Sequence, residues 1–472
     1  MRLNRRQLAK LGGATSIATL APQTILGNRE ELPRFLITLT CTGGASLNDS
    51  FLALRESDVD KAGGDPATLN CFPEQNIKTL DNLPFAAVNQ KTIISNLGDL
   101  PVKTDQIDFL KKYGHDLTVI TCEGSSVNHE VAQHRSLTGN NAWNGRTLME
   151  AVAAEYGSAF IMPYINLATG GYAEPGIDPT TPNYARAIQV TEPLSFALSL
   201  HSQKQIERLP SKELIDAARQ TRRLLEEDSP VAQQQARNPM VKNWKTWRSQ
   251  VLSSYEEADL INAFDILNKD HPQAELIWNT FPRIGIDPFD SQAAIAYLAL
   301  SRGISNVVSL GPSFQSTIIK LGEIYNPPIA FDFSHQDHRA VQAFMWDRML
   351  RVAGKLIDLL SLIELGSSGK SMWDRTMIYF ASDFGRDKIR SGGSEKFGSG
   401  HNLNNGFVFL SPMFRGGRVL GGIDPKTALT YGFDLETGRP QPGRTTTEEE
   451  VFATLLHVMG IKPAGLPRIG FA

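Results

Sequence analysis

The chain has 472 residues, of which 41% are hydrophobic and 21% are charged, as is typical of a soluble globular protein. Its net charge of −3 gives no reason to expect nucleic acid or an anionic membrane surface as a partner. The three cysteines (Cys41, Cys71 and Cys122) form neither a paired metal motif nor a disulfide framework.

The N-terminus carries a pattern that is typical of an export signal. Arg5 and Arg6 precede a mildly apolar stretch, 11–26, that is rich in Ala, Gly and Thr. Paired arginines before such a stretch are similar to a twin-arginine signal, and the alternative is a basic first helix. We therefore expect a signal segment at 1–30, the twin-arginine export machinery as a partner, and a periplasmic or secreted mature protein. No other stretch approaches the roughly 18 apolar residues of a membrane span, so we expect no integral span.

The first predicted strand is the apolar run at 35–41. It leads into Gly43 and Gly44, whose backbone freedom allows a tight turn. Asp49 follows, so we expect its carboxylate near the end of the strand. Residues 55–100 contain many Pro, Asn and Asp residues and no clear period, which predicts a loop-rich excursion.

A second unit of strand, turn and helix follows. The pattern predicts a short helix at 106–113, a buried strand at 117–122, and a helix that begins near Asn128. His129 falls in the first turn of that helix, where free backbone N–H groups make an anion site. We expect one of the two histidines in this segment, His129 and His134, to be structural.

The middle of the chain changes character after another helix and strand. A helix is predicted at 149–156 and a strand at 161–167, where a proline suits an edge position. Residues 190–282 are charged and amphipathic with helical spacing. We interpret this segment as a helical insertion or cap within an α/β domain that covers 31–472.

A cluster of ligand-type side chains follows a helix predicted at 291–302 and a strand predicted at 306–310. Its two carboxylates and two imidazoles are Asp332, His335, Asp337 and His338. This is the densest group of metal-type ligands in the chain. The alternative is a solvated cap, with Asp337 at the start of the helix predicted at 340–365.

The most informative stretch is 376–422. Apolar runs at 377–381 and 407–410 predict two buried strands, with Asp383, Arg386 and His401 between them. Chemistry in open α/β sheets gathers at the carboxyl ends of strands. The alternative is a polar surface loop in which Arg386 pairs with Asp387 or Glu395. Near the C-terminus, Thr445 and Glu448 suggest a capping box that opens the last helix.

Taken in order, these motifs resemble domain-of-unknown-function family 1501, a group of bacterial, often twin-arginine-exported proteins. The resemblance covers about residues 35–460 and rests on the order of the motifs rather than on any single one. The matching pieces are Arg5-Arg6, Gly43-Gly44-Ala45-Ser46 with Asp49, Asn128-His129 with Leu137-Thr138-Gly139, Phe331-Asp332 with His335, Ser382-Asp383-Phe384-Gly385-Arg386, Gly400-His401, Gly421-Gly422, and Ala453-Thr454-Leu455-Leu456 with Gly460.

The resemblance implies a doubly wound α/β sheet of the alkaline phosphatase/sulfatase-like type, with a divalent metal cluster at the C-terminal ends of its strands. The implied ligands of Zn²⁺, Mn²⁺ or Mg²⁺ are Asp49, Asp332, His335, Asp383 and His401. His129 would bind metal or substrate, and Arg386 would face an anionic group. The implied function is an exported, metal-dependent hydrolase of phosphate or sulfate esters, acting on an anionic small molecule or a glycan ester.

Three features depart from the family pattern. The family usually has Glu where Asp383 stands, and commonly an Asp-His pair where Gly400-His401 stands. Characterised hydrolases of the superfamily also carry a hydroxyl or thiol nucleophile near 125–129. When Leu137-Thr138-Gly139 is aligned with the family motif, His129 falls near that place. Ser125 or Ser126 would serve only if the turn is shifted. The sequence therefore leaves open whether the chain is an enzyme, and the alternative is a non-catalytic binding or assembly protein on a degenerate sulfatase-like scaffold.

Overall fold

The computed structural model describes residues 32–93, 104–143, 145–167, 175–200, 212–230, 233, 238, 260–312, 317–319, 323–326, 330–462 and 464–471. Its centre is a sheet of eight strands in the order β14-β4-β13-β10-β1-β7-β5-β6. The strands are β1 (Phe35–Cys41), β4 (Leu117–Glu123), β5 (Tyr164–Asn166), β6 (Ile188–Gln189), β7 (Val307–Leu310), β10 (Thr376–Ser382), β13 (Asn404–Leu410) and β14 (Arg418–Leu420).

The sheet is mostly parallel. β13 runs antiparallel to both of its neighbours, β10 and β4, and the other pairings in the sheet are parallel. β1 and β10 pair along their full length, from Phe35 opposite Thr376 to Cys41 opposite Ser382. The segments that follow β1 and β10 therefore leave the sheet side by side. The segment that enters β13 starts from the same edge, because that strand runs in the opposite direction.

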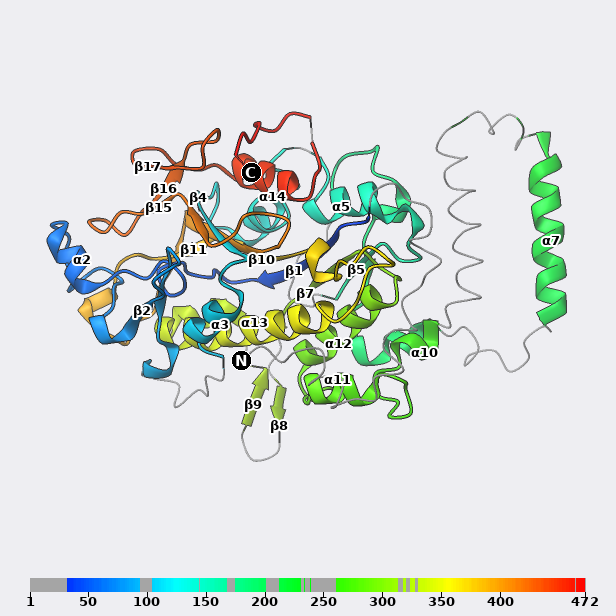
Figure 1. Cartoon of the computed structure of the whole chain (residues 1–472), viewed down its shortest axis with the longest axis horizontal. Helices are drawn as coiled ribbons and strands as arrows, with labels where there is room; N and C mark the ends of the chain where they lie inside the picture. Colours follow the sequence, from blue (N-terminus) through cyan, green and yellow to red (C-terminus); the bar gives the residue numbers. More distant parts are fainter. Residues whose placement is uncertain are drawn as a thin grey trace.

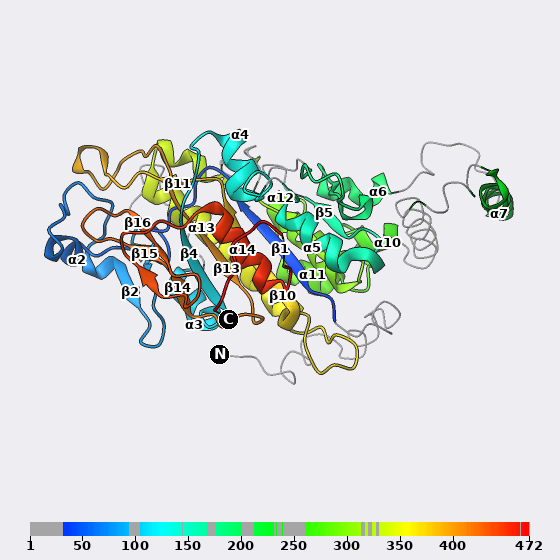
Figure 2. The same cartoon turned by 90° about the horizontal axis from the view of Figure 1, so that it is seen from above.

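Helices cover both faces of this sheet (Figure 1), as the predicted doubly wound α/β class requires. One face carries α3 (Gln106–Tyr113), α12 (Pro288–Ser301) and α13 (His338–Leu360), and the other carries α5 (Leu148–Tyr156) and α14 (Glu448–Val458). Figure 2 shows α5 and α14 lying over the strands when the molecule is seen from above. The predicted α/β class, with a mostly parallel central sheet between two helix layers, is confirmed.

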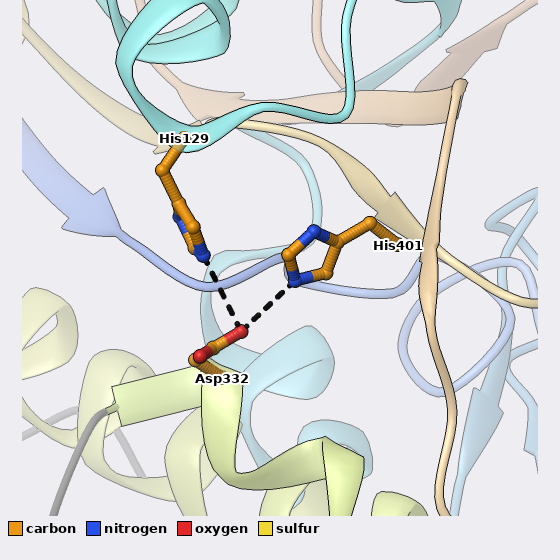
Figure 3. A group of neighbouring side chains, drawn as sticks. All are labelled: His129, Asp332 and His401. Atoms are coloured by element: carbon orange, nitrogen blue, oxygen red, sulfur yellow. Dashed lines mark hydrogen bonds and ion pairs between the residues drawn. The ribbon is translucent and has the colours of Figure 1, made fainter.

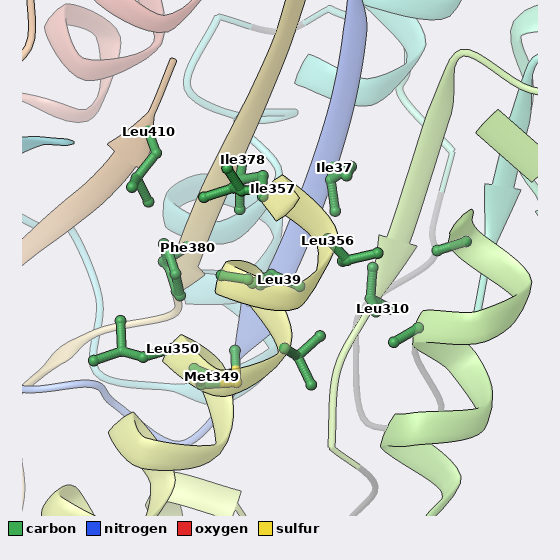
Figure 4. Close-up of a cluster of buried hydrophobic side chains, with 14 of the residues drawn as sticks. Ile37, Leu39, Leu310, Met349, Leu350, Leu356, Ile357, Ile378, Phe380 and Leu410 are labelled. Atoms are coloured by element: carbon green, nitrogen blue, oxygen red, sulfur yellow. The ribbon is translucent and has the colours of Figure 1, made fainter. Parts of the chain in front are cut away.

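The core on the α13 side is built from large aliphatic side chains (Figure 4). Met349, Leu350 and Leu356 of α13 are fully buried, and they face Leu39 of β1 and Phe380 of β10. Burial of each such side chain contributes about 1.5–3 kcal/mol relative to its exposure to water. This packing fixes α13 against the central strands, and it thereby fixes the segment that precedes the helix.

Side-chain hydrogen bonds cap the N-termini of α13 and α14. Asp337 accepts a hydrogen bond from the backbone N–H of Ala340 and begins α13, so the predicted cap is correct, although Asp337 is buried rather than solvated. The capping box of α14 is made by Thr447 and Glu450. The pair predicted from the sequence, two residues earlier, was therefore wrong.

The proline in the strand predicted at 161–167 does not mark an edge strand. Pro163 lies just before β5, which pairs on both sides, with β7 and β6.

The remaining helices and strands are short or lie outside the sheet. They are α2 (Glu56–Lys61), α4 (His129–Ala132), α6 (Phe196–Ser199), α7 (Lys212–Asp228), α10 (Leu260–Phe264), α11 (Ala274–Thr280), β2 (Ile77–Thr79), β3 (Ala86–Val88), β8 (Thr317–Ile319), β9 (Glu323–Asn326), β11 (Gly385–Arg386), β12 (His401–Asn402), β15 (Gly422–Ile423), β16 (Thr430–Phe433) and β17 (Pro440–Gln441). Within the described ranges, no helix combines the length and apolarity that crossing a membrane requires.

The described part of the segment 190–282 contains four α-helices, α6, α7, α10 and α11, joined in part by turns. Its assignment as an insertion or cap stays a prediction, because much of it lies outside the described residues. The expected signal segment, 1–30, lies outside them entirely.

Candidate metal centre

The turn after β1 brings distant segments together. Gly43 and Gly44 both have positive φ, +97° and +88°. A side chain at Gly43 would overlap the backbone of Asp332, which lies in the 3₁₀ helix η8 (Ala330–His335). The N–H of Gly43 also donates to both carboxylate oxygens of Asp383, at 3.1 and 3.2 Å. The tight turn predicted from the two glycines therefore places η8 and the end of β10 against the end of β1.

Three side chains from separate elements converge at this edge of the sheet (Figure 3). Nε2 of His129 lies 3.6 Å and Nε2 of His401 lies 3.1 Å from Oδ1 of Asp332. One ligand atom from each residue lies within 4.8 Å of the other two. The described residues thus contain a His/Asp/His group with the composition of a metal site.

Local structure fixes each member of this group. Asn128 caps α4 by accepting hydrogen bonds from two backbone N–H groups, which places His129 in the first turn as predicted. His401 lies in β12, which pairs with β11 so that Arg386 is directly opposite His401. Asp332 is held by η8 against the glycine turn.

The hydrogen bonds on the far side of the two imidazoles determine which nitrogen faces the centre. Nδ1 of His129 lies 2.9 Å from Oδ2 of Asp383, and Nδ1 of His401 lies 3.0 Å from the carbonyl oxygen of Val127. A carboxylate and a carbonyl can only accept, so both Nδ1 atoms carry the hydrogen. The Nε2 atoms of both rings consequently face Asp332. Between Nε2 of His129 and this carboxylate a cation is favoured, either a proton or a metal ion.

The two distances from Asp332 to the histidine nitrogens suit a tetrahedral ion. Two ligands at the 2.0–2.2 Å bond lengths of zinc and at a tetrahedral angle lie roughly 3.4 Å apart. The separations from Asp332 Oδ1 to the His129 and His401 nitrogens are 3.6 and 3.1 Å, which bracket that value. Two imidazoles and a carboxylate suit Zn²⁺ or Mn²⁺ better than Mg²⁺, which prefers oxygen ligands and bound water.

The pKa values of His129 and Asp332 show that this group favours a bound cation. Hydrogen bonds to Asp332 and Asp383 raise the pKa of His129 to about 9. Burial opposes ionisation of Asp332, but His129, His401 and the charge of Arg386 together hold the pKa of Asp332 well below its usual range. A divalent ion would take the place of the proton that His129 holds in its absence.

Two of the five predicted ligands have other partners. Asp383 is fully buried; Oδ1 accepts from the N–H of Phe384, and Oδ2 accepts from His129. It therefore orients His129, as carboxylates behind metal-binding histidines commonly do. Asp49 is also buried, and it accepts hydrogen bonds from His338 at 2.7 Å and Asn70 at 2.8 Å. Neither carboxylate belongs to the His/Asp/His group.

His335 lies beside the group rather than within it. Its Nε2 is 3.3 Å from Oδ1 of Asp332 and 2.9 Å from Nε2 of His401, and its side chain is 45% exposed. Burial and the nearby charge of Arg386 lower the pKa of His335, so the ring is neutral near pH 7. These distances suit either a fourth ligand or a group that exchanges protons with a bound molecule.

Arg386 is completely buried, although the sequence suggested that it faces an anion. It donates to the carbonyl oxygens of Gly43 and Ser399 and, at 2.8 Å, to Oδ1 of Asp332. Its guanidinium is thus occupied in joining loops and holding Asp332. The alternative pairing of Arg386 with Asp387 or Glu395 is also not observed, because Glu395 pairs with Arg339 and Arg390.

The candidate nucleophiles have contacts elsewhere. Oγ of Ser126 accepts a hydrogen bond from the backbone N–H of Asn128 at 3.0 Å. Oγ of Ser125 lies 3.0 Å from Glu448 at the start of α14. These bonds stabilise the turn before α4, and His129 occupies the place beside the centre.

Sequence reasoning missed Phe384. Its ring stacks on His401 with a centroid distance of 3.9 Å, and it contacts His129 at 4.8 Å. Phe384 is buried. A single aromatic residue between Asp383 and Gly385 in an otherwise polar loop was the sequence feature that could have identified it. Its contacts with both rings limit how they can rotate.

Comparison with known proteins adds little to this geometry. No family model matches the sequence, and no curated protein matches it either, so the resemblance to family 1501 stays a prediction. Among solved structures, the chain is similar to a protein in the alkaline phosphatase superfamily from Vibrio parahaemolyticus. That similarity has 11% sequence identity and a TM-score of 0.27, and it covers 98% of this chain and 76% of that chain. Because such a score does not establish a common fold, the case for a metal centre rests on His129, Asp332 and His401 themselves.

Proposed function

We propose that this protein is an exported, metal-dependent hydrolase of phosphate or sulfate esters, with a divalent ion held by His129, Asp332 and His401. The observation that carries the proposal is the convergence of two imidazole Nε2 atoms on one carboxylate oxygen. The twin-arginine pattern supports a periplasmic or secreted location, and the substrate would be an anionic small molecule or a glycan ester.

Three protein ligands leave one position of a tetrahedral ion open, which is the arrangement of catalytic zinc sites. An ion bound there would polarise an ester oxygen and lower the pKa of water. Asp383 and Val127 hold the two imidazoles, and Arg386 holds the carboxylate. In this proposal His335, which is neutral and partly exposed, exchanges protons with the substrate or with water.

A second function is favoured by the position of His335. If its Nε2 is a fourth ligand, the ion has no open position, and the site resembles a structural one. The protein would then be a non-catalytic binding or assembly protein, consistent with the contacts that occupy Ser125, Ser126 and Arg386.

The experiment that separates these functions uses His335→Ala and His401→Ala. Metal content of the mature protein is measured by elemental mass spectrometry, and hydrolysis of p-nitrophenyl phosphate and p-nitrophenyl sulfate is followed before and after chelation. If the protein is the proposed hydrolase, His401→Ala should lose the metal. His335→Ala should keep the metal but lose the hydrolytic activity. Loss of metal in both variants, without hydrolysis by the wild type, would favour the binding protein. Hydrolysis that is indifferent to chelators and to His401→Ala would rule out the metal-dependent enzyme.

A further inference from the structure

A buried chain of polar side chains lies next to the candidate metal centre and is not part of it. Asp49, His338 and Ser399 are 3%, 0% and 4% exposed. Oδ2 of Asp49 lies 2.7 Å from Nε2 of His338, and Nδ1 of His338 lies 2.7 Å from Oγ of Ser399. The three residues come from the loop after β1, the first turn of α13, and the loop before β12.

The carboxylate of Asp49 decides which atom donates in its hydrogen bond with His338. Ionised Asp49 can only accept, so His338 donates to it from Nε2, and the other ring nitrogen, Nδ1, shares a hydrogen with the hydroxyl of Ser399. The same oxygen of Asp49 also accepts from Ser46 at 2.7 Å and Asn70 at 2.8 Å. The ring of His338 is stacked on Phe397, with a centroid distance of 4.9 Å. The chain is therefore fixed at each of its members.

Ser399 connects this chain to the metal centre through its backbone. Its carbonyl oxygen accepts from Nη1 of Arg386 at 3.0 Å, and Nη2 of the same arginine donates to Asp332 at 2.8 Å. The N–H of Ser399 donates to the carbonyl oxygen of Ser334 at 2.9 Å, within η8. His401 is only two residues further along the chain.

We propose that Asp49, His338 and Ser399 form a positioning relay that fixes the loop before β12, and with it Arg386, Asp332 and His401, in the geometry that binds the ion. This proposal rests on the metal centre of the proposed function. The residue types match a hydrolytic triad, but the buried hydroxyl of Ser399 is directed at His338 and is closed to substrate. The relay acts on the ligands and not on the ester.

The test is Ser399→Ala, with Ser411→Ala as the matched control. Ser411 is also fully buried, and its hydroxyl donates to one backbone carbonyl, of Thr376, at the other end of β10. Affinity for Co²⁺ is measured by titration, and the visible absorption of bound Co²⁺ reports the coordination geometry. We expect Ser399→Ala to weaken Co²⁺ binding by about tenfold or more and to alter the spectrum, as for residues behind metal ligands. Ser411→Ala should lower the thermal midpoint of unfolding about as much as Ser399→Ala does. It should leave the Co²⁺ affinity and the Co²⁺ spectrum unchanged.

A double-mutant cycle with His338→Gln tests whether the members act as one unit. Glutamine keeps an amide donor toward Asp49, but its single amide group cannot bond Asp49 and Ser399 on opposite sides as the imidazole ring does. If the members act as one unit, the double variant should bind Co²⁺ no more weakly than the weaker-binding of the two single variants. Independent, additive losses, or Co²⁺ binding by Ser399→Ala equal to that of the wild type, would overturn the relay. Metal binding without ester hydrolysis would remove the proposed enzyme and leave the relay standing, whereas a wild type that binds no metal would overturn both.

Discussion

The guanidinium of Arg386 lies 2.8 Å from Oδ1 of Asp332, and the arginine is completely buried. The same guanidinium donates to the carbonyl oxygens of Gly43, Phe331 and Ser399. One side chain therefore joins the turn after β1, the helix η8 and the loop before β12. These are the segments that carry or position two of the three candidate ligands.

Arg386→Lys should be strongly destabilising although it keeps the charge. Lysine cannot reproduce the planar fork, so several buried carbonyl oxygens and Asp332 lose their donors. We expect the free energy of unfolding in urea to fall by about 2–4 kcal/mol. Arg146→Lys is the control, since Arg146 pairs with Asp178 at the partly exposed surface and should change stability by less than about 1 kcal/mol. Equal effects of the two substitutions would contradict this role of Arg386.

Gly43→Ala tests the contact between the first turn and η8. The added Cβ would overlap Asp332 at a φ of +97°, so either the turn or the ligand must move. We expect a loss of about 3 kcal/mol or more in unfolding free energy, together with a loss of bound metal.

The matched control for this substitution is Gly63→Ala. Gly63 also has positive φ, +76°, but a Cβ there would meet open space within the described part of the chain. The control should cost only about 1 kcal/mol, which is the backbone strain alone. If Gly43→Ala cost no more than Gly63→Ala, the turn would not be pressed against Asp332 as the structure has it.

The sequence was sufficient to predict the edge of the sheet at which the candidate centre lies. Apolar runs identify β1 and β10, and the glycine pair and polar loops after them identify the edge, because strand and turn formation depend on local residue types. Asp332 and His401 were predicted there as ligands, and the structure places both in the His/Asp/His group, with His129 as its third member.

The partners of the other charged residues could not be predicted in this way. Asp49 pairs with His338, which is 289 residues away in the sequence, and Arg386 is satisfied by carbonyl oxygens that any residue type could offer. Whether Asp383 meets an ion or the Nδ1 of His129 depends on side-chain direction and on how the loops approach each other. Neither property has a local sequence signal.

Asp383→Asn should weaken metal binding without unfolding the protein. The amide oxygen can still accept from the N–H groups of Gly43 and Phe384, which turns the amide NH₂ toward Nδ1 of His129. The ring must then carry its hydrogen on Nε2, the atom that faces Asp332. We expect metal affinity to fall by about 10–100-fold in a competition titration with a chelator. Asp374→Asn, at a surface turn where the carboxylate accepts from Ser371, is the control and should leave the affinity unchanged. Unaltered metal binding by Asp383→Asn would show that the tautomer of His129 is set by other contacts.

Asp49→Asn should change how stability depends on pH. Burial opposes ionisation of Asp49, but the charge and hydrogen bond of His338 lower its pKa to about 2. An aspartate in an unfolded chain has a pKa of about 3.9. The carboxylate therefore contributes stability, on the order of 2 kcal/mol, that is fully present above about pH 5 and is lost as the pH falls through about 2.

Urea unfolding of the wild type and Asp49→Asn at pH 7, 5 and 3 provides the measurement. The difference in unfolding free energy should be constant between pH 7 and 5 and should shrink by about 1 kcal/mol at pH 3, because the unfolded chain takes up a proton there and folded Asp49 does not. Asp60→Asn, at an exposed position of α2, controls for the loss of a carboxylate and should differ little from the wild type at each pH. A wild-type advantage over Asp49→Asn that stays constant down to pH 3 would mean that Asp49 is not held ionised by His338, and the first link of the relay would then have to be reassigned.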